Sequence, residues 1–240
     1  MDNGRTKTID ELVGLAKRFC HDDRSYRSHV HMRPGELAAT DGRILFHATD
    51  KAIAPEGYGE TLREDPVLDF TVGPEKVVAV RAQLEMLAAM LIPAWHSARE
   101  DMLKAREAFD RDMRTIVEQE GSIIRRCPCC GEEFVDDCGD LTSLEAWAEE
   151  NRPGDSDIKG VVWLGCPGLD APIPVSLRYL GMALSAAREL GGADSISTCV
   201  CGTPTVILRG DGWFIVIVAL RPQWIDKNDP VVRVNFEKED

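Results

Sequence analysis

The stretch Glu36–Phe46, ELAATDGRILF, decides the fold because it predicts a tight β-hairpin close to the N-terminus. An extended run leads into Asp41-Gly42, and an apolar run leads out of it. Glycine tolerates a positive φ, and Asp-Gly is one of the pairs that hairpin turns prefer. Because a chain that reverses direction in this way pairs with itself, we expect antiparallel sheet here.

An amphipathic helix is predicted before this hairpin. Thr8 and Glu11 have the spacing of a capping box, and the apolar residues from Leu12 to Phe19 share one helical face. We expect the helix to end near Cys20. Further strands are predicted on either side of the hairpin, at Tyr26–Met32 and Val67–Val72.

The middle of the chain has a different pattern. The apolar period becomes helical from Pro74 to about Gly121, and Pro93 is expected to break or kink this run into a helical hairpin or stalk. A Cys-rich stretch follows, then a short helix that Thr142 and Glu145 are expected to cap. Val161–Gly165 is a predicted strand.

The C-terminal part has the same order of elements as the N-terminal part, a helix followed by strands. A helix is predicted from Ser176 to Leu190, ended by Gly191-Gly192. Strands are predicted at residues 195–201, 205–209, 213–220 and 231–236. The two flanks look like matching halves, so we expect an α+β protein. Residues 1–73 and 173–240 would form one discontinuous domain, and residues 74–172 would be an inserted helical and zinc-binding module.

Two segments resemble the bacterial DNA sliding clamp, the β subunit of the replicative polymerase. LAATDGRIL resembles its Ala-Thr-Asp-Gly-His-Arg-Leu hairpin, and the segment from PVSLRYL to VALRP resembles the end of a clamp domain. The resemblance covers about residues 8–73 and 173–222. The sequence departs from the family at Arg43-Ile44 and at Val218-Ala219-Leu220. A full bacterial clamp has three such domains, and this chain has room for one.

The resemblance implies a docking site for short linear motifs of polymerases and repair proteins. In the family, the hairpin and the last strand line a hydrophobic pocket. Carried over by position, the peptide-binding residues are Thr40, Gly42, Arg43, Leu45, Val218 and Leu220. A single domain is expected to need a second copy, in a head-to-tail homo-oligomeric ring.

Clamp rings encircle double-stranded DNA with their helices facing inward. The resemblance therefore implies DNA-facing cations, and the predicted helices carry Lys17, Arg18, Arg178 and Arg188. Such binding would weaken steeply with salt and show no sequence preference. The alternative is that these few basic residues lie on an ordinary solvated helix face.

The cysteines predict a structural zinc site. Cys127 and Cys130 form a Cys-Pro-Cys-Cys-Gly knuckle, a spacing that suits two thiolate ligands of one tetrahedral ion. Cys138 and Cys166 are the favoured other ligands because they need no long-range closure. The alternative pair, Cys199 and Cys201, would tie the insertion to the main domain.

Charge and motifs limit the classes of function. The formal net charge of -13 argues against simple tracking of DNA phosphates. We find no apolar signal segment and no run long enough to cross a membrane, so a cytoplasmic protein is expected. No phosphate-loop, nucleophile-elbow or zinc-protease motif occurs, so we expect no enzyme. A compact chain with a large insertion would suit a phage protein.

These observations lead to one principal interpretation and one alternative. The principal interpretation is a clamp-like protein of DNA replication or repair, acting as a processivity ring or docking platform without catalysis. The alternative is a zinc-binding regulator of protein–protein interactions that uses the clamp fold without encircling DNA. Because a ring requires closed symmetric assembly, the mass in solution separates the two.

Overall fold

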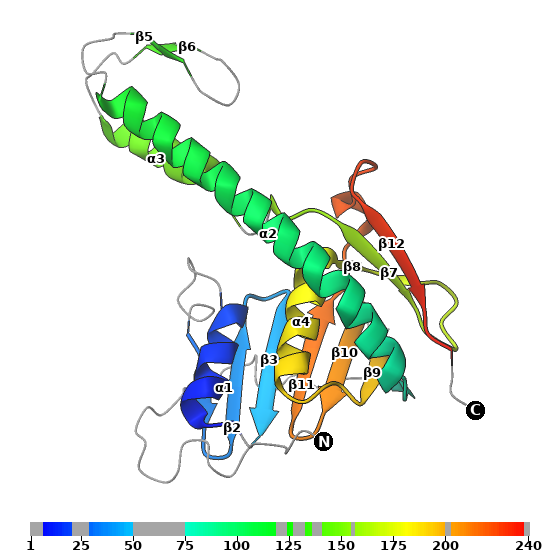
Figure 1. The fold of residues 1–240 in the computed structure, drawn as a ribbon. Coiled ribbons are helices and arrows are strands. Elements are labelled where there is room, and N and C mark those ends of the chain that lie inside the picture. The colour runs from blue at the N-terminus through cyan, green and yellow to red at the C-terminus, as the bar shows by residue number, and fades with distance from the viewer. Residues whose placement is uncertain are drawn as a thin grey trace. The chain divides into compact units, whose positions relative to one another are not determined.

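A computed structural model describes residues 7–20, 29–49, 75–118, 124–126, 133–135, 141–154, 157–199 and 203–237 (Figure 1). The chain divides into two compact units. One unit contains residues 1–94 and 160–240, and the other contains residues 95–159. The elements confirm the α+β class, with helices packed on antiparallel sheet.

A seven-stranded sheet with the order β1-β2-β3-β11-β10-β9-β4 is the centre of the first unit. Its strands are β1 (His31–Arg33), β2 (Glu36–Thr40), β3 (Ile44–Thr49), β4 (Glu75–Val78), β9 (Ser195–Cys199), β10 (Thr205–Gly210) and β11 (Trp213–Val218). All of its neighbouring strands are antiparallel. The pairing of β3 with β11 joins the N-terminal strands to the C-terminal strands, so the two predicted halves share one sheet.

Two helices cover one face of this sheet (Figure 1). They are α1 (Ile9–Ala16), which continues as a 3₁₀ helix (Lys17–Phe19), and α4 (Leu177–Glu189). The predicted capping box of Thr8 and Glu11 is present. Phe19 stacks on Phe46 of β3 with ring centroids 5.2 Å apart. The apolar face of the N-terminal helix thus anchors it to the hairpin strand.

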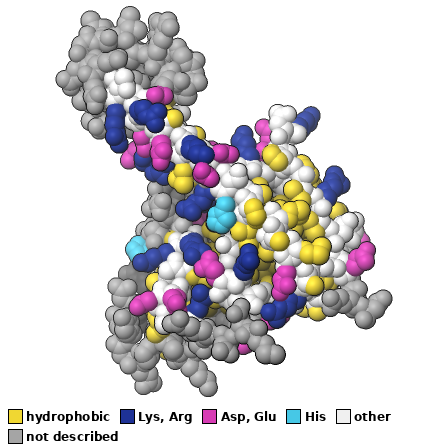
Figure 2. Space-filling view, viewed as in Figure 1, with side chains coloured by type: hydrophobic (Ala, Val, Ile, Leu, Met, Phe, Trp, Pro, Cys, Tyr) yellow, Lys and Arg dark blue, Asp and Glu magenta, His cyan; other side chains and the backbone are white. Residues whose placement is uncertain are grey.

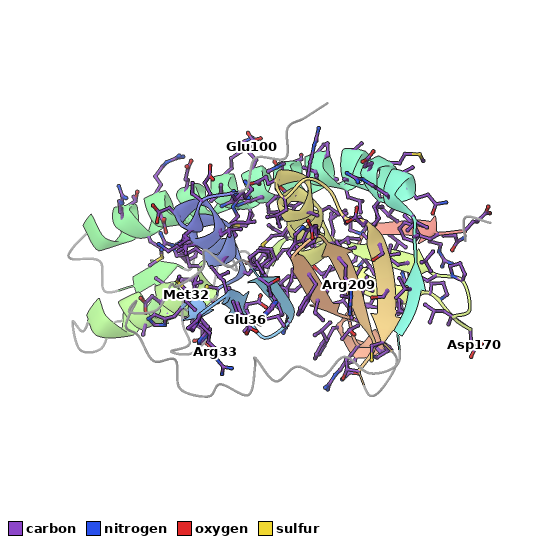
Figure 3. All side chains as sticks on the ribbon, turned by 90° about the horizontal axis from the view of Figure 1, so that it is seen from below. Met32, Arg33, Glu36, Glu100, Asp170 and Arg209 are labelled. Carbon is purple, nitrogen blue, oxygen red and sulfur yellow. The ribbon has the colours of Figure 1, made fainter. Side chains whose placement is uncertain are left out.

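The side chains of β3 alternate between the two faces of the sheet. Phe46 meets the helical layer, whereas His47 stacks on Phe214 of β11, with ring centroids 4.7 Å apart. Figure 3 shows Glu36 and Arg209 on strands of the same sheet. Burial lowers the pKa of His47, although nearby Glu36 opposes this shift.

A second sheet has the order β12-β7-β8. Its strands are β7 (Val161–Gly165), β8 (Ile173–Ser176) and β12 (Val231–Asn235). The sequence interpretation missed β8, which is short and ends directly before the first residue of α4. Leu220, just after β11, donates its N–H to the carbonyl of Pro174 at 2.8 Å, so one backbone hydrogen bond links the end of β11 to this second sheet.

Of the two arrangements predicted for this segment, the helical hairpin broken at Pro93 is wrong, and a single long helix fits the stalk. One continuous helix, α2 (Arg81–Glu118), contains this proline. Proline removes one hydrogen bond and strains the preceding turn at a cost of ~3 kcal/mol. Here Pro93 and Ala89 are both exposed, so water can satisfy the carbonyl that loses its partner. The buried residues Leu91 and Trp95 on either side keep the helical period.

Two further boundaries differ from the sequence interpretation. Residues just after Pro74 form β4, not a helix, because Val77 and Val78 pair with β9 at the edge of the sheet. The helix expected to be capped by Thr142 is α3 (Leu141–Asn151), which already includes Thr142. The predicted strand at Val67–Val72 lies outside the described residues, and Tyr26–Met32 is described only from residue 29.

The second unit contains the later part of α2, α3 and a small hairpin. The hairpin pairs β5 (Ile124–Arg126) with β6 (Glu133–Val135). Phe109 of α2 stacks on Trp147 of α3 with centroids 6.1 Å apart. Arg152 donates two hydrogen bonds to the carboxylate of Asp110, at 2.8 and 2.5 Å. These contacts place α3 beside α2.

Hydrophobic side chains gather on the face shown in Figure 2. Among the exposed large hydrophobic residues of α2, Met86 is 73% exposed and Met90 is 50% exposed. In the part of the chain that the structure describes, no helix has both the length and the apolar character needed to span a bilayer.

Candidate functional site

The turn after β2 is held by its own side chains. The hydroxyl of Thr40 donates to the carbonyl of Ile44 at 2.6 Å and accepts the N–H of Gly42 at 2.9 Å. The carboxylate of Asp41 accepts the N–H groups of Arg43 and Ile44, at 2.8 and 3.0 Å. Gly42 has a φ of +90°, which favours glycine. The loop is therefore specified by Thr-Asp-Gly.

Asp41 also links the turn to α4. Only 6% of Asp41 and 5% of Tyr179 is exposed. A side-chain hydrogen bond joins the two residues. Burial, together with the charge of Asp41, raises the pKa of Tyr179 to about 12. A buried carboxylate that accepts several hydrogen bonds is satisfied, so Asp41 serves as a structural anchor.

The hairpin turn lies directly beside the C-terminal end of β11. Val218 donates its N–H to the carbonyl of Arg43 at 2.8 Å. Ala219 donates to the carbonyl of Pro204 at 2.9 Å. Two segments separated by about 175 residues are thereby brought into one continuous patch. Its backbone is rigid because β3 and β11 are paired along their lengths.

An exposed tryptophan adjoins this patch. Trp224 ends a short 3₁₀ helix (Pro222–Trp224) and is 46% exposed. The guanidinium carbon of Arg43 lies 5.3 Å from the Trp224 ring centroid, and that of Arg221 lies 5.0 Å from it. Such distances allow cation–π attraction. We call Gly42, Arg43, Val218, Leu220, Arg221 and Trp224 the hairpin–strand surface.

The six predicted peptide-binding residues therefore lie in one region of the sheet, but they are not equally accessible. Gly42 and Arg43 are exposed, and Val218 and Leu220 are half-buried. Thr40 and Leu45 are buried, with 4% and 8% exposed. Leu45 packs in an apolar cluster with Ala38, Ile207 and Val216. A ligand on the surface could therefore not contact the side chains of Thr40 and Leu45 directly.

Sequence reasoning missed three residues of the region: Asp41 as an anchor, Tyr179 as its partner, and Trp224 as the exposed aromatic group. Trp224 lies beyond the segments that resemble the clamp family. The only sequence signal for it was the Arg-Pro-Gln-Trp order, in which proline begins the 3₁₀ turn. No local pattern could bring Arg43 to Trp224, because that contact depends on the β3–β11 pairing.

The predicted DNA-facing residues lie on α4 and on the 3₁₀ helix that follows α1. Arg178 lies in the first turn of α4 and Arg188 in the last, about 15 Å apart at the helical rise. The guanidinium of Arg18 donates to the carboxylate of Glu189, at 2.5 and 3.1 Å. Lys17 is exposed on the 3₁₀ helix. Binding of DNA by these residues stays a prediction.

A groove of about 1140 Å³ lies at the C-terminal end of α4, next to α1 and the first turns of α2. Its charged lining residues are Lys7, Arg81, Arg188, Glu11, Glu85, Glu189 and Asp211. Arg81 is held by Asp194 and by the carbonyl of Gly191, at 3.2 and 2.9 Å. Because acidic side chains outnumber basic ones, this groove does not favour phosphate.

The zinc prediction is only partly within the described residues. Cys127, Cys130, Cys138 and Cys201 lie outside them. Cys166 follows β7, is buried, and has a pKa raised to about 11 by that burial. Cys199 is buried at the end of β9. Among the described residues, no group of three or more His, Cys, Asp or Glu could hold a metal ion.

Comparison with known proteins adds one weak likeness. No family model matches the chain, and no curated protein matches it. Among solved structures, the chain is similar to the DNA polymerase III subunit beta from Pseudomonas aeruginosa, with 12% identity and a TM-score of 0.37. The match covers 92% of this chain and 68% of that chain. A likeness at this level carries no argument about function.

Proposed function

We propose that this chain is a clamp-like, non-enzymatic docking platform of DNA replication or repair. The hairpin–strand surface would receive a short linear segment of a partner protein. The observation that carries the proposal is the bond from Val218 to the carbonyl of Arg43, which joins the two segments that resemble the clamp family. An exposed aromatic residue on a rigid backbone is the kind of anchor that interfaces use.

The test is selection of random peptides on the immobilised full chain. We expect wild-type protein to enrich a family of related peptides. Trp224→Ala and Val218→Glu should abolish that enrichment, because they remove the anchor and place a charge in the patch. Met86→Ala, on exposed α2, is the matched control and should enrich the same peptides as wild type. Failure to enrich any peptide, or equal enrichment on all variants, would refute the proposal.

A head-to-tail ring on DNA is the second candidate, and free strand edges favour it. Within the described ranges, no strand pairs with the outer edge of β1 or of β4. Open edges are templates for pairing with another chain. Light scattering, with and without primed DNA, tests this candidate. A closed oligomer whose DNA binding falls steeply with salt would support it, and a strictly monomeric mass under both conditions would exclude it.

We further propose a structural zinc ion held by Cys127, Cys130, Cys138 and Cys166, with Cys199 and Cys201 as the alternative pair. The knuckle spacing supports it. Protein purified in zinc-supplemented medium should contain one zinc per chain by elemental analysis. Cys127→Ser with Cys130→Ser should lose the metal. Cys166→Ser and Cys199→Ser decide between the two ligand sets, since only a true ligand lowers the zinc content.

A further inference from the structure

The cations of the hairpin–strand surface indicate what kind of segment fits it. Arg43 and Arg221 are both exposed, and among the described residues neither guanidinium has a carboxylate partner. Both lie about 5 Å from the Trp224 ring. Arg178 adds a third positive charge nearby, 5.0 Å from the ring of Tyr179. In a chain with a net charge of -13, this concentration of arginine is local.

The acidic groups close to these arginines are already engaged. Asp41 is buried under the turn and bound to Tyr179 and to two backbone N–H groups. Asp226 accepts the N–H of Asn228 at 2.9 Å, and Asp229 accepts the N–H of Asp226 at 3.2 Å. These carboxylates hold the chain after Trp224 in a turn. Within the described residues, the guanidinium groups of Arg43 and Arg221 therefore form no salt bridge with these carboxylates.

We propose that the hairpin–strand surface recognises an acidic linear segment, in which Asp or Glu adjoins an apolar side chain. The carboxylate would accept hydrogen bonds from the guanidinium groups of Arg43 and Arg221, a planar pairing that arginine favours. The apolar side chain would pack on the part of Trp224 that remains exposed. This inference rests on the proposed docking function and extends it through Trp224, which lies outside the family resemblance.

A single nucleic-acid strand is the competing ligand, because bases stack on tryptophan and arginine binds phosphate. The surface favours a peptide for two reasons. A strand needs a track of cations along its backbone, whereas these arginines form one compact cluster around a single aromatic ring. The overall negative charge would also repel a polyanion more strongly than a segment with one or two carboxylates.

The experiment compares peptide selection on wild type and on a charge-reversed variant, Arg43→Glu with Arg221→Glu. We expect wild type to enrich peptides with Asp or Glu beside a large apolar residue. The reversed variant should enrich Lys or Arg at the same positions. If wild type enriches peptides without acidic residues and reversal leaves the selection unchanged, the acidic-segment inference is overturned while the docking function stands. If nothing is enriched on wild type, the docking function itself fails.

Affinities then give a quantitative check, with the most enriched peptide made synthetically and labelled with fluorescein. Arg43→Gln and Arg221→Gln should each weaken binding about tenfold, the loss expected for one charge-assisted contact. Arg111→Gln, an exposed arginine of the second unit, is the matched control and should bind like wild type. Unchanged affinity in both arginine variants overturns the inference.

The same titration is repeated with a fluorescein-labelled oligothymidine. We expect it to bind more weakly than the peptide and to compete poorly with it. Tighter binding of the oligothymidine, lost in Arg43→Gln and Arg221→Gln, would overturn the inference in favour of single-stranded DNA. Thermal unfolding of each variant should match wild type, because all of these side chains are exposed.

Discussion

At the scale of single residues, Asp41 determines more structure than its place in a turn suggests. Its carboxylate closes the hairpin loop through two N–H groups and binds Tyr179 of α4. One buried side chain thus joins the N-terminal hairpin to the C-terminal helix. The Asp41-Gly42 dipeptide by itself predicts a turn. The bond from Asp41 to Tyr179 could not be predicted in this way, because the partner lies far along the chain.

Replacement of Asp41 should therefore be costly. We expect Asp41→Ala to lower the free energy of unfolding by about 2–4 kcal/mol, because one buried and one part-buried N–H group and a tyrosine hydroxyl lose their acceptor. Urea denaturation followed by circular dichroism measures this. Asp211→Ala, in the exposed turn before β11, is the control and should change stability by about 0.5 kcal/mol or less. Equal effects of the two substitutions would contradict the anchoring role.

The raised pKa of Tyr179 predicts a loss of stability in alkali. Folding favours the neutral phenol, so its contribution is fully present below pH 10.0 and is lost as the pH rises toward about 12. We expect Tyr179→Phe to be less stable than wild type at neutral pH, and its stability should fall less over this alkaline range. Urea denaturation at several pH values measures the difference. Parallel curves for the two proteins would refute the assignment.

At the scale of elements, α2 shows that a proline does not always end a helix. Pro93 has the residue chemistry of a helix breaker, yet the helix continues through it for 25 residues to Glu118. Apolar residues on both sides keep contact with the protein interior, and this burial offsets one lost hydrogen bond. Sequence periodicity predicts helix on each side of Pro93, and the structure confirms it as one helix.

The cost of this proline can be measured. Pro93→Ala should stabilise the protein by up to about 3 kcal/mol, because alanine restores the hydrogen bond and has the highest helix propensity. The position is exposed, so no cavity or clash is introduced. Chemical denaturation gives the change, and Ala94→Pro, one residue later, should destabilise. A neutral or destabilising Pro93→Ala would show that the proline costs the helix no stability.

The ion pair between α2 and α3 should contribute only modestly. Arg152 holds the pKa of the Asp110 carboxyl below its usual value through their hydrogen bonds. Its contribution is present above the ordinary carboxyl pKa and is lost as the pH falls through the lowered value. A double-mutant cycle of Asp110→Asn and Arg152→Gln should give a coupling of about 0.5–1 kcal/mol at neutral pH. A coupling that persists in strong acid would contradict a salt bridge.

At the scale of the whole molecule, the pairing of β3 with β11 makes the two ends of the chain one structure. The central strands come from residues 44–49 and 213–218, and each is buried among its neighbours. The interrupting unit, residues 95–159, has its own contacts. We therefore expect β3 and β11 to unfold together, although they lie far apart in the sequence.

Hydrogen exchange tests this arrangement. We expect the amides of Phe46 and Ile215 to open with the same free energy, equal to that of global unfolding, because both lie in the central pair of strands. The amides of α3 should exchange faster, since none of its residues whose burial is described, 146–151, is buried. Separate opening energies for β3 and β11 would show that the two flanks unfold independently.

The sequence by itself determined the local elements: the capped N-terminal helix, the Asp-Gly hairpin, the second helix with its glycine end, and the three strands that follow it. Caps, turn residues and apolar period act over a few residues, so they can be read directly. The tertiary structure alone decided which of these elements meet. The cluster of Arg43, Arg221 and Trp224, the anchor from Asp41 to Tyr179, and the unbroken α2 all depend on contacts between distant residues, whose pairing no local pattern encodes.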